Sequence, residues 1–358
     1  MLFEFRRATV ALLTTSGILL LLAAGLASGQ SPVFRSDTRV VEVAVVAKSG
    51  DGSPVSDLHQ RDFRLFDNTA EQTLLSFENL GVARLTLNAN NASTTARDRP
   101  TLRRSIIVLD ELNTSLAGRV NERKAISEML RSLPPGEDRI AIFALGDTLH
   151  LLHDFSTDIV SLRASVDTYE GERPATGLGE RNPFSGGFSL AAPRPTQDAD
   201  SYAELRLSRT LEAFTELARN MSNVPGEKNL LWLTAGFAPP EDRRDVEAAT
   251  RALKAARMTM YPIDARGLLT CPPTGCPPEI NLNIATMEDF AQQTGGRAFH
   301  DDNGLSTLAR AALDDSREGY ILTYSPNNYL QDGSAHTVQL KVARKSLDLR
   351  YRSGYLAE

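Results

Sequence analysis

Short apolar runs alternate with helix-like segments through the middle of the chain, and this pattern constrains the fold more than any other feature. The runs contain mainly aliphatic and β-branched residues and cover residues 105–110, 139–145, 229–234 and 258–264. Continuous apolar strands of this kind are typical of a parallel sheet that is buried on both faces. Strands that alternate with helices form βαβ units. The sequence therefore predicts an α/β fold with a doubly wound, mostly parallel, Rossmann-like sheet.

The segments between these runs have helical periodicity and recognisable end signals. Helices are predicted over residues 120–133, 202–221, 241–257, 283–294 and 305–313. Gly295-Gly296 supplies a C-cap, and Asp158 or Thr157 caps a further helix. A short run over 149–152 follows 139–145 so closely that we expect a hairpin, and hence one antiparallel strand beside the parallel ones.

Both ends of the chain have the alternation of β-strands. Short strands are predicted over residues 38–47, 55–58, 63–66 and 73–77, and again over 319–324, 336–342 and 347–352. The C-terminal strands are too few for a stable domain alone. We therefore expect the two sets to pack into one smaller β-sandwich, with the α/β domain inserted between its halves.

Shifts in composition give the expected domain boundaries. They are an N-terminal β unit over 34–84, a polar linker over 85–103, the α/β domain over 104–316 and C-terminal strands over 317–358. A Gly-, Pro- and Ser-rich loop over 170–200 interrupts the α/β domain. Loops of this length in compact domains are usually functional or disordered.

Residues 1–29 have the pattern of a secretory signal peptide. Arg6 and Arg7 precede an apolar run, and Ala27-Ser28-Gly29 provides small residues for cleavage. The alternative is an uncleaved anchor, because the run is near the lower length limit for a spanning helix. Both interpretations export the rest of the chain to the periplasm, the cell surface or the medium. After cleavage, no membrane association is expected.

Charge and cysteine content narrow the partners further. The formal net charge of −6 argues against nucleic acid, because phosphate binding needs concentrated positive charge. An exported protein favours a disulfide between its two cysteines, Cys271 and Cys276. A bridge between residues so close in sequence would fix one loop and contribute little to global stability. Zinc is the alternative, but no third or fourth ligand stands nearby.

Two motifs, Ile106-Ile-Val-Leu-Asp110-Glu-Leu-Asn-Thr114 and Leu230-Leu-Trp-Leu-Thr234-Ala-Gly236, resemble a von Willebrand factor type A domain. Over residues 34–357 the chain also resembles the VWFA-related exported proteins described from acidobacteria. The motifs that carry this second resemblance are, in order, Val55-Ser-Asp-Leu58 with Asp62-Phe63, Asp110-Glu-Leu-Asn-Thr114, Asp154-Phe-Ser-Thr-Asp158, Tyr261-Pro-Ile-Asp-Ala-Arg-Gly267, Thr294-Gly-Gly-Arg-Ala298 and Gly354-Tyr355. The resemblance implies a metal-ion-dependent adhesion site above the carboxyl ends of the strands, which is also where open α/β sheets bind ligands.

The family pattern for that metal site is only partly present. It uses Asp-x-Ser-x-Ser after the first strand, a Thr from a later loop and an Asp after the fourth strand. Asp110 matches the first Asp and Thr114 the second Ser, whereas Leu112 and Ala235 replace two other ligands. Asn113 could add a carbonyl oxygen, so the resemblance implies a weak Mg²⁺ or Ca²⁺ site at Asp110, Asn113 and Thr114. Alternatively, Asp110 and Thr114 cap the following helix and order the loop.

A degenerate hydrolase of the haloacid dehalogenase type is a further alternative. Its residue types occur in the expected order, as Asp110, Thr114, Thr234, Lys254 and Asp301-Asp302. However, Leu112 replaces the second Asp of that motif, so no side chain is left to protonate the leaving group.

These observations favour an exported, non-enzymatic binding or adhesion protein with a protein or glycan partner. The expected contact surface is a rim that includes Glu111, Thr234 and Gly236 together with the 170–200 loop; Glu111 could also supply a carboxylate to a metal. The second hypothesis is a metal-independent structural or assembly component of the cell envelope.

Overall fold

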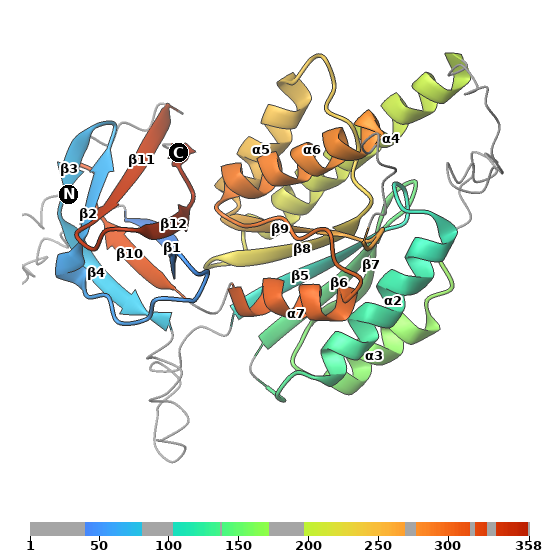
Figure 1. Cartoon of the computed structure of the whole chain (residues 1–358), viewed down its shortest axis with the longest axis horizontal. Coiled ribbons are helices and arrows are strands. Elements are labelled where there is room, and N and C mark those ends of the chain that lie inside the picture. The colour runs from blue at the N-terminus through green and yellow to red at the C-terminus, as the bar shows by residue number, and fades with distance from the viewer. Residues whose placement is uncertain are drawn as a thin grey trace, which may run out of the picture. The chain divides into compact units, whose positions relative to one another are not determined.

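In the computed structural model of the chain, the apolar runs form one five-stranded sheet with the order β7-β6-β5-β8-β9 (Figure 1). The strands are β5 (Arg103–Asp110), β6 (Asp138–Leu145), β7 (Leu149–Ser156), β8 (Lys228–Thr234) and β9 (Met258–Asp264). All pairings are parallel except that of β7, which forms a hairpin with β6. The predicted mostly parallel sheet with one antiparallel edge strand is therefore confirmed.

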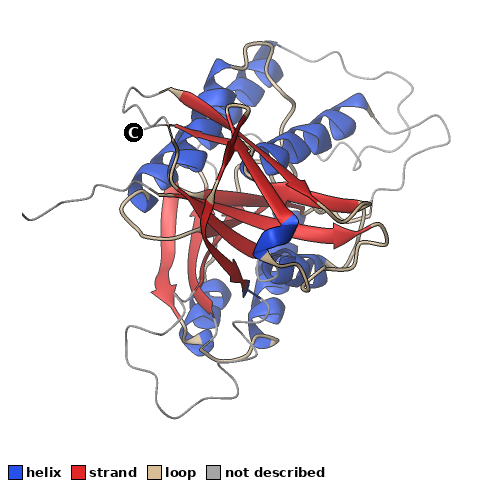
Figure 2. Cartoon of the chain, turned by 90° about the vertical axis from the view of Figure 1, so that its left-hand side faces the viewer, coloured by secondary structure: helices blue, strands red, loops and turns tan. Residues whose placement is uncertain are grey.

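Helices cover both faces of this sheet, as Figure 1 shows and Figure 2 shows from the side. They are α2 (Leu116–Arg131), α3 (Ile159–Thr168), α4 (Gln197–Met221), α5 (Arg244–Ala255), α6 (Pro278–Thr294) and α7 (Leu305–Asp315). Alternate residues of β5 face opposite sides: Ile106 and Val108 pack with α4, α5 and α6, whereas Ile107 and Leu109 pack with α2, α3 and α7. Because both faces are covered, a strand without a polar face is the expected sequence.

The two ends of the chain interleave in a β-sandwich. One sheet has the order β12-β1-β10-β4 and the other β13-β11-β2-β3. The strands are β1 (Val41–Ser49), β2 (Phe63–Asp67), β3 (Ala70–Gln72), β4 (Leu74–Asn79), β10 (Tyr320–Tyr324), β11 (Ala335–Val342), β12 (Leu347–Tyr351) and β13 (Gly354–Leu356). Val43 and Leu322 of the first sheet share a core with Leu65 and Leu340 of the second. The smaller sandwich predicted from both ends is confirmed.

Some predicted elements differ in the structure. Residues 55–58 form no strand, because Tyr320 takes the backbone groups that a strand would use: its hydroxyl donates to the Val55 carbonyl and accepts from the Leu58 amide. Beyond the five strands of the main sheet, Phe299 makes a single parallel bridge with Ile263. Helix α6 begins five residues earlier than predicted, at Pro278, and ends as predicted on the left-handed Gly295.

The structure describes residues 40–80, 103–136, 138–171, 197–268, 277–315, 319–327 and 334–356, all of which belong to one compact unit. The expected signal peptide (1–29), nearly all of the linker (85–103), most of the 170–200 loop and both cysteines lie outside these residues. Within them, no helix has the length and hydrophobicity needed to cross a membrane.

Candidate functional site

Asp110 is the last residue of β5 and lies at the carboxyl edge of the sheet. Its side chain is fully buried, and both of its carboxyl oxygens accept hydrogen bonds. The Oδ1 atom accepts from the backbone amides of Leu112 (3.1 Å) and Asn113 (3.0 Å). The Oδ2 atom accepts from Asn113 Nδ2 (2.8 Å), Trp232 Nε1 (3.0 Å) and Thr234 Oγ1 (2.6 Å). We call this group of donors the Asp110 cage.

Strand register explains why two of these donors come from β8. Leu109 lies opposite Leu233 in the parallel pairing, so the next residues, Asp110 and Thr234, are neighbours. Trp232 precedes Thr234 by two residues and therefore points to the same face of the sheet. Two side chains of one strand thus reach the same carboxyl oxygen.

The direction of each hydrogen bond in the cage follows from chemistry. Backbone and indole N–H groups can only donate. Thr234 Oγ1 accepts from the Gly236 amide at 2.8 Å, so its hydrogen is directed to Asp110. Asn113 Nδ2 also donates to Thr210 Oγ1 at 2.9 Å, and that hydroxyl donates in turn to the Arg206 carbonyl. All five contacts therefore place a hydrogen against the carboxyl group.

Burial and hydrogen bonding act on the Asp110 carboxyl in opposite directions. Burial raises its pKa, because the charged form is desolvated. Hydrogen bonds from Thr234, Asn113 and Trp232 stabilise the ionised form and offset part of that rise. Both oxygens of the Asp110 carboxyl accept hydrogen bonds and neither donates one, and this arrangement suits the ionised form.

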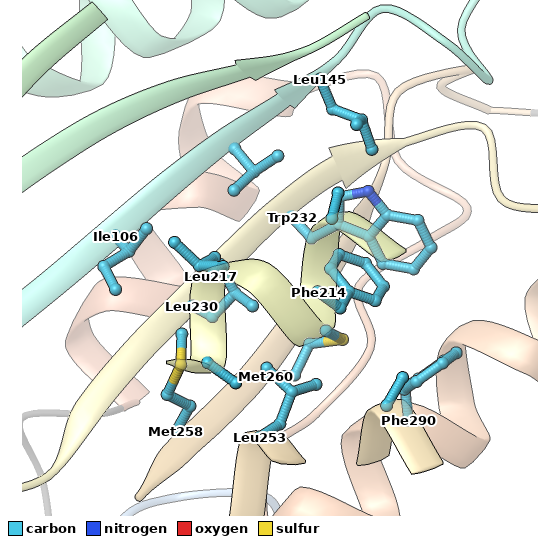
Figure 3. Packing of buried hydrophobic residues seen from close by; sticks show 14 of the residues in the cluster. Ile106, Leu145, Phe214, Leu217, Leu230, Trp232, Leu253, Met258, Met260 and Phe290 are labelled. Carbon is cyan, nitrogen blue, oxygen red and sulfur yellow. The ribbon is translucent and has the colours of Figure 1, made fainter. Parts of the chain in front are cut away.

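Apolar packing closes the cage on its other side. Trp232 is fully buried and packs edge-on against Phe214, with ring centroids 5.0 Å apart (Figure 3). Phe237 and Phe290 are in the same aromatic cluster, at 5.9 Å and 6.3 Å from the Trp232 ring. Leu112, which stands where the family pattern has a metal-binding Ser, packs against this core. The cage is therefore held between the sheet and a hydrophobic cluster.

Thr114 is not one of the donors that form the Asp110 cage. Ser115, not Thr114 or Asp110, is the N-cap of α2, because its hydroxyl accepts from the Gly118 amide. The hydroxyl of Thr114 and both carboxyl oxygens of Glu122 are buried and have no hydrogen-bond partner. Burial raises the pKa of Glu122 well above its usual value, and the nearby Asp110 and Glu111 carboxylates act in the same direction.

The three predicted rim residues are all buried. Glu111 is 2% exposed, pairs with Arg123 at 3.0 Å and accepts from the Tyr169 hydroxyl at 3.1 Å. Thr234 belongs to the cage. Gly236 has a φ of 72° and packs closely on Asn283, so it makes the turn that leads the chain away from β8. The structure thus brings Glu111, Thr234 and Gly236 to the same sheet edge but directs their polar groups inward.

The donor set around Asp110 does not fit a divalent cation. A carboxylate offers about four lone-pair sites, and five hydrogens already surround this one. A cation at Oδ2 would be placed against the indole, amide and hydroxyl hydrogens. The carboxyl of Glu122 lies near Thr114, and its burial disfavours the charged form that a cation would need. The part of the chain that the structure describes contains no group of three or more His, Cys, Asp or Glu able to hold a metal.

Of the residues of the hydrolase alternative, Asp110 and Thr234 are in contact, but Lys254 is not brought to them. Lys254 lies in the last turn of α5, and its carbonyl accepts from Arg352 in the segment after β12. This end of α5 leads into the start of β9, at the amino edge of the sheet, whereas Asp110 is at the carboxyl edge. Asp302 accepts from the Gly304 amide in a local turn. No arrangement for phosphoryl transfer results.

The sequence did not identify three residues as part of the site: Trp232, Thr210 and Glu122. The signal for Trp232 was present, because a buried indole N–H usually needs a hydrogen-bond partner. Glu122 interrupts the apolar face of α2 one turn after Gly118, which is also a readable signal. Thr210 had none, because its partner Asn113 is 97 residues away in sequence.

Comparisons with known proteins give neither a family nor a function for this chain. No protein-family model and no curated protein matches it. Among solved structures, it is similar to an aerotolerance-related membrane protein from Bacteroides fragilis (13% identity, TM-score 0.38, covering 60% of this chain and 98% of that one). It is also similar to BatB from Bacteroides thetaiotaomicron (14%, 0.34, 60% and 98%). A third is proximal thread matrix protein 1 from the mussel byssus, with a zinc-occupied MIDAS motif (8%, 0.36, 62% and 47%). Identities and TM-scores this low are not evidence for a shared function.

Proposed function

We propose that this chain is an exported, non-enzymatic binding protein of the von Willebrand type A kind, which recognises a protein partner at the carboxyl edge of its sheet. The signal-peptide pattern supports export, and the motif order supports the family. The observation that carries the proposal is the distribution of exposed apolar side chains, which is concentrated at this edge.

Nine large apolar side chains are exposed among the described residues, and five of them belong to segments at the carboxyl edge. Leu116 and Val120 lie in the first turns of α2, directly after the Asp110 loop. Leu205 lies on the part of α4 that extends beyond Thr210. Leu268 follows β9, and Leu282 precedes Asn283, whose amide donates to the Ala235 carbonyl. Contiguous exposed apolar surface is typical of protein contact sites, and we propose that these side chains contribute to such a surface.

Ion pairs neutralise several of the charges along this edge. Arg266 is held by Asp264 at 2.8 Å, Arg123 by Glu111 at 3.0 Å, and Arg243 by Asp289. A surface with paired charges and exposed aliphatic groups fits an apolar protein surface better than a polyanion or a glycan. Glycans are bound mainly through hydrogen bonds, so a glycan partner would be expected to need free polar groups at the rim.

The proposal is tested with the mature protein, residues 30–358, immobilised as bait for cell-envelope extract. Single variants Leu116→Asp and Leu282→Asp alter the edge, and Leu75→Asp is the matched control, because Leu75 is equally exposed (56%) but lies in β4 of the sandwich. We expect a partner retained by wild type and by Leu75→Asp and lost from both edge variants. Equal retention by all four proteins would contradict binding at this edge.

A metal-independent structural component of the envelope is the second candidate, and the Asp110 cage favours it because the cage holds its loops without a cation. Analytical ultracentrifugation separates the two functions. Self-association of the pure chain that Leu116→Asp abolishes would support an assembly role, whereas a monomer that needs an extract partner would support the binding role.

A further inference from the structure

The Asp110 cage stands where the family resemblance places a divalent cation, and its chemistry is the opposite of a metal site. A metal site presents lone pairs to a cation. Here the described neighbours of the Asp110 carboxyl present hydrogens to it, from the backbone, Asn113, Trp232 and Thr234.

We infer that the five hydrogen-bond donors replace the cation, so that the carboxyl edge of this protein keeps its shape without any metal. A cation at a sheet edge links the loops that supply its ligands. The cage does the same with hydrogen bonds, because it joins β5, the loop that follows it, β8 and, through Asn113 and Thr210, helix α4.

The changes at two further positions agree with this replacement. Leu112 packs an aliphatic side chain against the hydrophobic core where a hydroxyl ligand is expected. Ala235 follows Thr234 where an acidic ligand is expected, and its carbonyl is taken by the Asn283 amide at 3.2 Å. Both substitutions remove oxygen ligands, while Trp232 and Asn113 add N–H donors. Compared with the family pattern, groups that could coordinate a cation are thus lost and groups that donate hydrogen bonds are gained.

The consequence for recognition rests on the proposed function. A bound cation with an open position attracts a carboxylate from the partner. Without a cation, the partner has no reason to present an acidic group, and contact is made through the aliphatic side chains of the edge. Binding should therefore be unaffected by a chelator.

The cage itself can be tested without any partner, because Trp232 is the only tryptophan in the chain and its indole contacts Asp110 directly. Since Trp232 is fully buried, quenching by collision with dissolved ions is weak. A Mn²⁺ ion at Asp110 would quench its emission in a saturable way. We titrate the mature protein with Mn²⁺, Mg²⁺ and Ca²⁺ and record emission and melting temperature, with EDTA as the reference.

We expect no saturable quenching and the same melting temperature with each cation and with EDTA. Asp110→Asn should lower the melting temperature equally in all conditions, because its amide places hydrogens against the hydrogens of Trp232 and Thr234. Thr234→Val keeps the shape of the side chain and removes one donor, and it serves where Asp110→Asn does not fold; it should give a smaller loss that is again independent of cations. Saturable Mn²⁺ quenching that Mg²⁺ competes away and that either variant abolishes would overturn the inference. Failure to find a partner would leave this result unchanged.

Discussion

Asp315 gives the sharpest test of how the chain-end sandwich is attached to the α/β domain. This residue ends α7, and its carboxylate is 2% exposed. Lys48 of β1 contacts its Oδ1 at 2.6 Å, and Arg350 of β12 donates to both oxygens at 2.9 Å and 3.0 Å. A single carboxylate thus receives cations from two neighbouring strands of the sandwich.

The expected cost of Asp315→Asn follows from this burial. Removing one partner of a buried ion pair typically costs roughly 3–5 kcal/mol, because the other charge is left without compensation. Lys48 and Arg350 keep 14% and 16% exposure and can be partly rehydrated, so the lower end applies. We expect a loss of about 3 kcal/mol in the free energy of unfolding. For a chain of this size, that lowers the melting temperature by about 4 °C.

The measurement is urea unfolding followed by Trp232 emission for the α/β domain and by far-UV circular dichroism for the whole chain. Asp57→Asn is the matched control. Asp57 accepts a bidentate pair of hydrogen bonds from Arg344 (2.8 Å and 2.9 Å), as short as those between Asp315 and Arg350, but on the exposed surface. Exposed pairs of this kind contribute little, so no measurable change is expected. An Asp315→Asn protein as stable as the Asp57→Asn protein would refute the argument from burial.

Three further predictions concern packing, backbone space and pH. Phe214→Ala removes a ring that packs on both Trp232 and Phe290 and should cost roughly 3–5 kcal/mol in urea unfolding; a loss below about 1 kcal/mol would mean that the aromatic cluster collapses to fill the space. Gly296→Ala would place a Cβ 1.9 Å from the Met260 carbonyl oxygen and should lower the free energy of unfolding by about 3 kcal/mol. Gly50→Ala is the control and should leave stability unchanged, because a Cβ there would have no atom within 4 Å. Equal melting temperatures for the two variants would disprove the clash at Gly296. Burial lowers the pKa of Lys228 from 10.5 to about 8, so between these pH values the unfolded chain binds more protons than the folded chain. The free energy of unfolding should therefore rise as the pH increases from about 8 to 10.5. Thermal melts across this range should show a smaller rise for Lys228→Met than for wild type, and an unchanged slope would exclude Lys228 as its source.

Local pattern was sufficient for the elements and their layers. The buried runs became β5, β6, β8 and β9 because strands covered by helices on both faces need no polar side, and this is visible in the sequence itself. The sandwich was also predictable, because the strands at the C-terminal end were too few to be stable alone and the N-terminal β unit was available to complete them.

The segment at 55–58 shows where local pattern fails. Its residues suit a strand, but the Tyr320 hydroxyl, 262 residues from Leu58 in sequence, takes the backbone groups instead. No local signal reports such a contact. The predicted N-cap was wrong for a different, local reason: Asp110 and Thr114 were the predicted caps, whereas the helix begins after Ser115, whose hydroxyl accepts from the Gly118 amide.

The sequence by itself determined that Asp110 ends a central strand and that Leu112 and Ala235 cannot coordinate a cation. Only the tertiary structure decided what surrounds Asp110, because its partners Trp232 and Thr234 are more than 120 residues away and reach it through the register of β5 against β8. Periodicity reports which face of an element is buried. Which atoms meet in that interior depends on register and loop geometry, and these are fixed only when the whole core packs.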